Sequence, residues 1–190
     1  MHLIKPSFHT QSTSATVCLF VACMILGSDV TAQVRSGESL RSSPNAIVGQ
    51  TIGTTEVTIT YGRPSVRDRI IFGELVPFDT IWRTGANEAT TITFSHDVIV
   101  EGESLPAGTY GLFTIPRENN EWTIIFNNIA EQWGAYRYDP GEDVLRVEVM
   151  AEEAPHMEQM MFFFDDVEGN SGKVVLHWKD VMVSFQIVEK

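Results

Sequence analysis

The sequence predicts an all-β protein, an antiparallel β-sandwich or jelly-roll-like fold in a single domain. Apolar residues recur at every second position over short stretches, and turn-forming residues separate nearly every pair of stretches. No amphipathic stretch is long enough for a convincing helix of three turns. Short strands at spacings of about 8 to 12 residues are typical of sandwiches and jelly rolls, in which each strand turns one apolar face to the core.

Residues 1–32 are predicted to be a secretory signal peptide. Lys5 precedes an apolar run over residues 17–27 that is too short to span a bilayer. The residues Val30-Thr31-Ala32 fit the small-x-Ala pattern of a cleavage site, and we expect cleavage after Ala32. Both cysteines, Cys18 and Cys23, lie in this segment, so the exported chain would have no thiol or disulfide chemistry. The protein is therefore expected in the periplasm or the extracellular medium.

A lipid anchor on Cys23 is the alternative use of the same segment. Ala22 precedes this cysteine, but the apolar stretch before it is short and Phe20 suits a lipidation signal poorly. Cleavage after Ala32 is favoured, and no transmembrane segment is expected once the signal has been removed.

The exported chain is strongly acidic. Loss of Lys5 and Asp29 with the signal leaves 12 basic and 24 acidic residues of the 13 and 25 in the whole chain, so the net charge stays at −12. Such a surface repels a phosphate backbone, which argues against a nucleic-acid partner. The sequence does not identify protein partners.

Metal and cofactor motifs are lacking in the sequence. The histidines of the exported chain, His96, His156 and His177, have no metal-ligand spacing, and the acidic residues near Gly172 do not match a calcium loop. Neither a nucleophile-elbow motif nor a glycine-rich phosphate loop occurs. We therefore expect no metal and no cofactor.

The polar residues 33–43 are expected to form a flexible leader before a β-sandwich domain over residues 44–190. Turns are expected at 105–108 and at Asn119-Asn120. Two apolar runs, 174–178 and 181–188, are expected to form a terminal hairpin across Lys179-Asp180. The strands before them are predicted around alternating apolar or threonine residues: Val57, Ile59 and Tyr61; Thr90, Ile92 and Phe94; Trp122, Ile124 and Phe126; Leu145, Val147 and Val149; Met160, Phe162 and Phe164.

Residues 62–88 break this alternation and are the leading candidate for a site. The segment is long, irregular and arginine-rich in an acidic chain, and loops on a rigid β scaffold commonly carry function. Guanidinium groups bind carboxylate or phosphate, and an indole ring stacks on flat or sugar-like ligands. The predicted ligand-binding residues are Arg63, Arg69, Trp82, Arg83 and Asn87.

A purely structural use of the same segment stays open. Arg69 or Arg83 would then pair with Glu88, Asp68 or Asp79 to hold the loop on the sheet, and a tryptophan would fill the core. The loop that contains Trp133 and its neighbouring tyrosines also has a functional and a structural interpretation. Its rings would either stack on a carbohydrate or form a cap over the core.

Glu88 is the candidate catalytic residue, as a general acid or base. It lies beside amide and arginine groups where a strand is expected to begin, but no second carboxylate or histidine is identifiable as its partner. Whether the protein is an enzyme therefore stays undecided at this point.

Several blocks of the sequence together resemble the bacterial domain of unknown function 2911. The blocks are YGRPSVRDRIIFGELVPF (61–78), IWRTGANEATTITF (81–94), LPAGTYGLFTIP (105–116), WTIIFN (122–127) and WGAYRYD (133–139). The resemblance covers residues 43–188 and implies an exported β domain without an assigned reaction, cofactor or ligand. The chain departs from that pattern at Arg67-Asp68-Arg69, where the family tends to have Lys-Gly-Arg, and Asp68 introduces a possible internal partner for an arginine.

Three functions follow from these observations. The first is a module that binds a small anion or a saccharide through residues 63–88. The second is an enzyme acting on an envelope glycan or peptide, with Glu88 as acid or base and Arg83 stabilising charge. The third is a structural or interaction protein without a small-molecule site, whose arginines brace the loop.

Overall fold

The computed structural model describes residues 40–190, so the predicted signal peptide and residues 33–39 of the leader lie outside the described part of the chain. The fold is all-β and antiparallel, as the alternating pattern predicts. One short 3-10 helix, η1 (Pro140–Glu142), precedes β8. The strands are β1 (Asn45–Ile52), β2 (Thr55–Gly62), β3 (Thr90–Phe94), β4 (Val98–Val100), β5 (Glu103–Leu105), β6 (Gly108–Ile115), β7 (Glu121–Asn127), β8 (Asp143–Glu168) and β9 (Ser171–Glu189).

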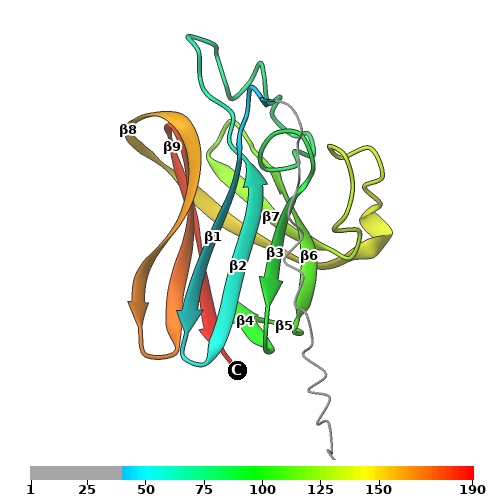
Figure 1. The fold of residues 1–190 in the computed structure, drawn as a ribbon. Coiled ribbons are helices and arrows are strands. Elements are labelled where there is room, and N and C mark those ends of the chain that lie inside the picture. Colours follow the sequence, from blue (N-terminus) through cyan, green and yellow to red (C-terminus); the bar gives the residue numbers. More distant parts are fainter. Residues whose placement is uncertain (1–39) are drawn as a thin grey trace, which may run out of the picture. The chain divides into compact units, whose positions relative to one another are not determined.

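The nine strands form one continuous sheet in the order β1-β2-β3-β6-β7-β8-β9-β4-β5. The sheet folds over into a sandwich at β8, which pairs with β7 at its start and with β9 further along. Residues 143–150 of β8 pair with β7, whereas the pairing with β9 begins at Ala151. Register shifts on either side of Met157 accompany this change of partner, and Figure 1 shows β8 passing through a strong bend. Bulges of this kind let a single strand contribute to both layers.

Aromatic side chains from the two layers meet in the core. Tyr61 of β2 packs edge-on against Phe162 of β8, with ring centroids 4.9 Å apart, and Phe126 of β7 does the same against Phe185 of β9 at 5.7 Å. In β2 the alternate residues Val57, Ile59 and Tyr61 are buried, as a strand with one face on a core requires.

The C-terminal hairpin expected across Lys179-Asp180 is wrong. Residues 171–189 form the single strand β9, and Lys179 pairs with Met157 of β8. Lys179 has φ of 57°, so a local left-handed kink interrupts the apolar pattern without reversing the chain. The reversal lies earlier, where Glu168 pairs with Ser171. Similarly, the two apolar stretches 145–149 and 160–164 belong to one strand, β8.

Strand β7 is buried on both faces because a loop covers the outside of its layer. Phe113 of β6 and Ile125 of β7 are fully buried in a second, small apolar cluster, against which Ile81 and Tyr138 pack. The Tyr138 and Phe113 rings lie 5.1 Å apart. The loop between β7 and β8 thus contributes a cap over the sheet, one of the two roles considered for its aromatic residues.

A hydrogen-bonded network holds that loop to the start of β8. The Tyr138 hydroxyl donates to Asp143 Oδ2 at 2.7 Å, Arg146 Nε donates to the same oxygen at 2.7 Å, and Asn127 Nδ2 donates to Asp143 Oδ1 at 2.7 Å. Asp143 keeps only 6% of its side chain exposed. Burial, followed by the hydrogen bond to Asp143, raises the pKa of Tyr138 to about 12.

This shift predicts a loss of stability in alkali that Tyr138 controls. An unfolded tyrosine titrates near pH 10, so between roughly pH 10 and 12 the unfolded state loses its proton first. The stabilisation is complete below pH 10 and is lost as the pH rises toward the pKa of the folded state. Two pKa units correspond to at most about 2.7 kcal/mol, and partial solvent access reduces this to on the order of 1–2 kcal/mol.

Urea unfolding at pH 9 and pH 11.5 checks this expectation. The drop in unfolding free energy between the two pH values should be smaller in Tyr138→Phe than in the unchanged protein. The comparison with the variant is needed because burial also raises the pKa of Tyr110. Equal drops in both proteins would contradict the assignment.

Candidate functional site

The irregular segment predicted to carry a site connects β2 to β3 at the end of the sheet where β2 finishes (Figure 1). Two isolated bridges attach it to the sandwich: Ser65 pairs with Gln159 of β8, and Trp82 pairs with Thr114 of β6. Backbone hydrogen bonds in both directions between Trp82 and Thr114, at 2.8 and 2.9 Å, fix the second attachment. The segment is therefore a loop anchored at defined points on a rigid scaffold.

A pocket of about 250 Å³ lies between this segment and β9. Four of the five predicted ligand-binding residues line it: Arg69, Trp82, Arg83 and Asn87. The fifth, Arg63, and the candidate catalytic Glu88 are not among its lining residues. The remaining lining residues are Ser43, Pro64, Leu75, Val76, Gly85, Ala86 and Trp178.

The pocket is basic although the chain is acidic. Two arginines line it, and none of its lining residues is Asp or Glu. Burial away from water lowers the pKa of Arg83 from its usual value, an effect that the nearby Tyr136 opposes. Within residues 40–190, no ion pair joins Arg83 to a carboxylate. A desolvated guanidinium without a counter-ion favours an anion at this position.

Two buried N–H groups of the pocket residues lack a hydrogen-bond acceptor. They are Arg83 Nε and Trp178 Nε1, both shielded from solvent. A buried donor left without an acceptor costs about 1–3 kcal/mol, so such groups are rare in folded proteins and call for an explanation. Each of these groups would be satisfied by an acceptor brought within hydrogen-bond reach of it.

Stacked indole rings form an apolar wall beside these donors. The rings of Trp82 and Trp178 lie 5.8 Å apart at an interplanar angle of 20°. Trp82 Nε1 donates to the carbonyl of Gly85 at 3.2 Å, and the Phe72 ring packs edge-on against both indoles. Trp82 is only 8% exposed, so it fills the core and lines the pocket at once.

Arg63 and Arg69 are engaged by backbone carbonyls. Arg63 Nε donates to the carbonyl of Met160 at 2.9 Å, which ties the loop to β8. Arg69 Nε and Nη2 donate to Val66 and Ser65 at 3.0 and 2.6 Å, so this arginine closes its own turn while it lines the pocket. Arg63 therefore only holds the loop in place, whereas Arg69 holds its own turn in place and also lines the pocket.

Glu88 forms a bidentate ion pair with Arg41. Arg41 Nη1 lies 2.7 Å from Oε2, and Nη2 lies 3.0 Å from Oε1. Both side chains are about one-quarter exposed. The hydrogen bond to Glu88 is the main reason why the pKa of Arg41 is raised. The carboxylate is thus occupied by a guanidinium from the leader rather than directed at the pocket.

Residues 40–43, the described end of the predicted leader, form a strap along the loop. Besides the ion pair of Arg41, Arg67 Nη2 donates to the carbonyl of Ser42 at 2.9 Å, and Asn87 Nδ2 donates to the carbonyl of Ser43 at 3.0 Å. Asn87 has φ of 66°, a left-handed conformation that asparagine tolerates better than most residues. Through Ser43, the strap supplies part of the pocket wall.

The internal pairs considered for the loop arginines do not form among the described residues. Glu88 pairs with Arg41, and Asp79 lies 3.8 Å from Arg117. Asp68 takes part in no ion pair within residues 40–190 and has φ of 57°, a conformation that glycine adopts without strain. A glycine would therefore fit the backbone at this position without strain.

Trp178 is a pocket residue outside the 63–88 loop that the sequence did not single out. It lies in β9, far along the chain from the loop, and reads as an ordinary core residue of a strand. Its neighbour His177 is only 8% exposed, with Nε2 2.9 Å from the carbonyl of Pro155, a satisfied packing position. No local signal distinguishes the unpaired indole of Trp178, because the missing acceptor is a property of the tertiary structure.

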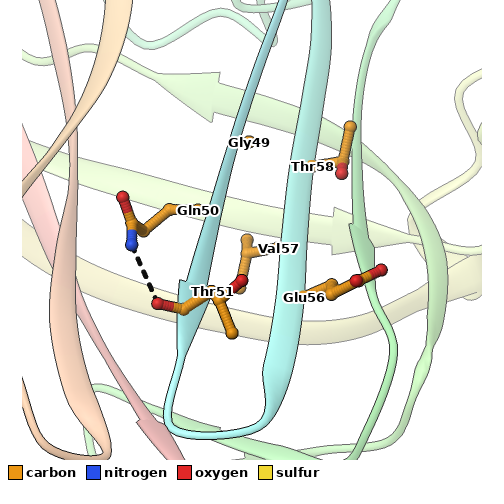
Figure 2. Close-up of a pocket in the computed structure, with 6 residues that line it drawn as sticks. All are labelled: Gly49, Gln50, Thr51, Glu56, Val57 and Thr58. Atoms are coloured by element: carbon orange, nitrogen blue, oxygen red, sulfur yellow. Dashed lines mark hydrogen bonds between the residues drawn. The ribbon is translucent and has the colours of Figure 1, made fainter.

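The β1–β2 hairpin carries a second hollow, shown in Figure 2. It has a volume of about 400 Å³ and is lined by Gly49, Gln50, Thr51, Glu56, Val57 and Thr58. Gln50 Nε2 donates to the carbonyl of Thr51 at 2.9 Å, so its amide is already engaged. Neighbouring strands of one hairpin form this hollow, and its lining contains neither an aromatic nor a basic residue. The loop pocket is the stronger candidate.

Neither a metal-binding cluster nor a membrane-spanning helix occurs in residues 40–190. This part of the chain contains no cluster of three or more His, Cys, Asp or Glu side chains placed to hold a metal ion. It also contains no helix with the length and apolar character needed to cross a membrane.

Comparison with known proteins gives one result. The family model described as "Protein of unknown function (DUF2911)" matches residues 43–187, which include every residue that lines the loop pocket. No curated protein and no solved structure matches the chain. The match covers most of the sequence, and the chain therefore belongs to the DUF2911 family.

Proposed function

We propose that this protein is an exported binding module for a small organic or inorganic anion, held in the pocket between the 63–88 loop and β9. The observation that carries the proposal is the pair of buried donors without acceptors, Arg83 Nε and Trp178 Nε1, in a pocket lined by two arginines and no carboxylate. An anion supplies acceptors and a negative charge together, which is what this arrangement lacks.

The scaffold supports binding by a largely preformed site. Trp82 is fixed by its backbone pairing with Thr114 and by its indole hydrogen bond to Gly85, so the wall next to Arg83 does not need to be ordered when a ligand enters. A preorganised site avoids part of the entropic cost of binding. The pocket volume of about 250 Å³ lies below the range of about 300–1,000 Å³ common for drug-sized ligands, which favours a small molecule.

Catalysis by Glu88 receives less support from the geometry. A general acid or base has to reach the reacting group, directly or through one water. Glu88 does not line the pocket, and both of its oxygens accept hydrogen bonds from Arg41. The binding module is therefore favoured over an envelope-acting hydrolase.

Arg83→Met tests the proposal because it removes the charge and the donors but keeps much of the side-chain length. We expect at least one of acetate, benzoate, phosphate and sulfate to bind the purified protein saturably in calorimetric titrations, and Arg83→Met to weaken that binding by about 100-fold. Loss of a desolvated charge pair costs about 2–5 kcal/mol, and each 1.4 kcal/mol is tenfold in affinity.

Arg117→Met is the matched control. It removes one positive charge by the same substitution, but Arg117 pairs with Glu148 and does not line the pocket. Binding should change by less than threefold in this variant. The proposal fails if none of the four anions binds saturably, or if the two variants weaken binding equally.

A further inference from the structure

We infer that the preferred anion is a monocarboxylate with a compact apolar body, such as a single ring or a short branched chain. This inference rests on the proposed anion-binding function and narrows it to one chemical class. It comes from the composition of the pocket lining, where two arginines are accompanied by several apolar side chains.

The donor end of the pocket, which we define as Arg83 and Trp178, suits a planar, fully deprotonated group. The guanidinium of Arg83 presents its Nε–H beside terminal N–H groups in one plane, which matches the two oxygens of a carboxylate. Trp178 Nε1 adds one donor and no acceptor. A carboxylate has two acceptor oxygens, enough for both residues, and brings no hydrogen-bond donor of its own.

Apart from the two arginines, most residues that line the pocket have apolar side chains. Pro64, Leu75, Val76, Trp82 and Ala86 provide apolar surface, together with the ring of Trp178. A phosphate ion would place further charged oxygens against this wall, and desolvation of polar groups without partners opposes binding. An apolar body of the ligand would instead gain free energy from burial there.

A saccharide, the other ligand class considered from the sequence, fits less well. Each sugar hydroxyl brings a donor that needs an acceptor when buried. The side-chain acceptors in the lining are confined to Ser43 and Asn87, and there is no carboxylate. The exposed rings Trp133 and Tyr136 lie outside this lining, so they do not provide a stacking face within the pocket.

The test is a titration of the purified protein with benzoate, cyclohexanecarboxylate, acetate, inorganic phosphate, glucuronate and benzamide. We expect the two ring carboxylates to bind at least tenfold more tightly than acetate, phosphate and glucuronate, and benzamide, which has no charge, to bind at least as weakly as acetate. Phosphate or glucuronate binding as tightly as benzoate would overturn this inference but leave the anion-binding function standing. If none of the anions binds, both fall.

A pair of wall variants separates the apolar contribution from the charge. Leu75 lines the pocket and is 45% exposed, whereas Ile70 belongs to the same loop, is 55% exposed and does not line it. Leu75→Asn should weaken benzoate binding about tenfold and leave acetate binding within twofold, while Ile70→Asn should change neither. Equal weakening of benzoate and acetate by Leu75→Asn would contradict an apolar subsite.

The indole N–H of Trp178 gives a direct readout of the donor end. In ¹H–¹⁵N spectra, benzoate should move the Trp178 indole signal downfield as Nε1 gains an acceptor, and Trp178→Phe should remove this signal and weaken benzoate binding about tenfold. Trp122→Phe is the control, because Trp122 is equally buried but does not line the pocket. Benzoate binding that leaves the Trp178 signal unmoved would overturn the assigned pose.

Discussion

Trp82→Ala is expected to lower the free energy of unfolding by about 3–5 kcal/mol, the usual cost of removing a large buried aromatic side chain. Trp82 is 8% exposed and touches Trp178, Trp122 and Phe72 through ring contacts with centroid separations of 5.8 to 6.5 Å. Its removal also takes away the hydrogen bond to the carbonyl of Gly85. The loss combines apolar burial, ring contacts and one polar contact, and the rigid backbone pairing with Thr114 limits collapse of the cavity.

Two further variants locate the cause of that loss. Trp82→Phe keeps an aromatic ring and should cost less than the alanine variant, since part of the volume and ring contact is retained. Trp133→Ala removes the same kind of side chain at a site that is 55% exposed and should cost less than about 1 kcal/mol. Chemical denaturation measures all three; similar losses in Trp82→Ala and Trp133→Ala would show that Trp82 is not part of the core.

Asp143→Ala is expected to destabilise the protein by about 2–4 kcal/mol, because one nearly buried carboxylate joins three side chains. It accepts from Tyr138, Arg146 and Asn127, which come from the loop, from β8 and from β7. The Tyr138 hydroxyl also accepts from Arg146 Nη2 at 2.7 Å, so this one contact survives the substitution. The cap that Tyr138 places on Phe113 should loosen as a result.

Asp180→Ala is the matched control for this loss. Asp180 pairs with Lys179 on the surface, where its side chain is 56% exposed, and a solvated pair contributes less than about 1 kcal/mol. Equilibrium unfolding in urea should therefore separate the two variants clearly. In Asp143→Ala, hydrogen exchange should also increase in residues 128–142, and an unchanged exchange rate there would contradict the role of Asp143 in holding the loop.

Residue patterns predicted the fold class because each strand buries one face. Val57, Ile59 and Tyr61 alternate with polar residues for this reason, and the structure places all three in the core. The same reasoning failed at Lys179-Asp180, where polar residues and a positive φ mark a kink inside β9. A bulge and a hairpin turn use similar residues, and only the pairing partner of the strand distinguishes them.

The candidate site could be predicted as a segment but not as a pocket. Composition identified the 63–88 loop, since its arginines stand out in an acidic chain, and four of its predicted residues line one pocket. Arg63 has the same chemistry as Arg83, yet it is tied to the carbonyl of Met160. The contact of Glu88 with Arg41 was likewise beyond prediction, because it joins residues separated by 47 positions.

The sequence by itself determined the all-β class, the family and the segment that bears the pocket, because alternation, composition and motif order are local properties of the chain. The tertiary structure alone decided how β8 joins two layers, which arginine lacks an acceptor, and that Trp178 of β9 completes the pocket. These features depend on which distant groups come together and on which donors lose water without gaining an acceptor. Such relations arise when the chain packs, and no single stretch of residues encodes them.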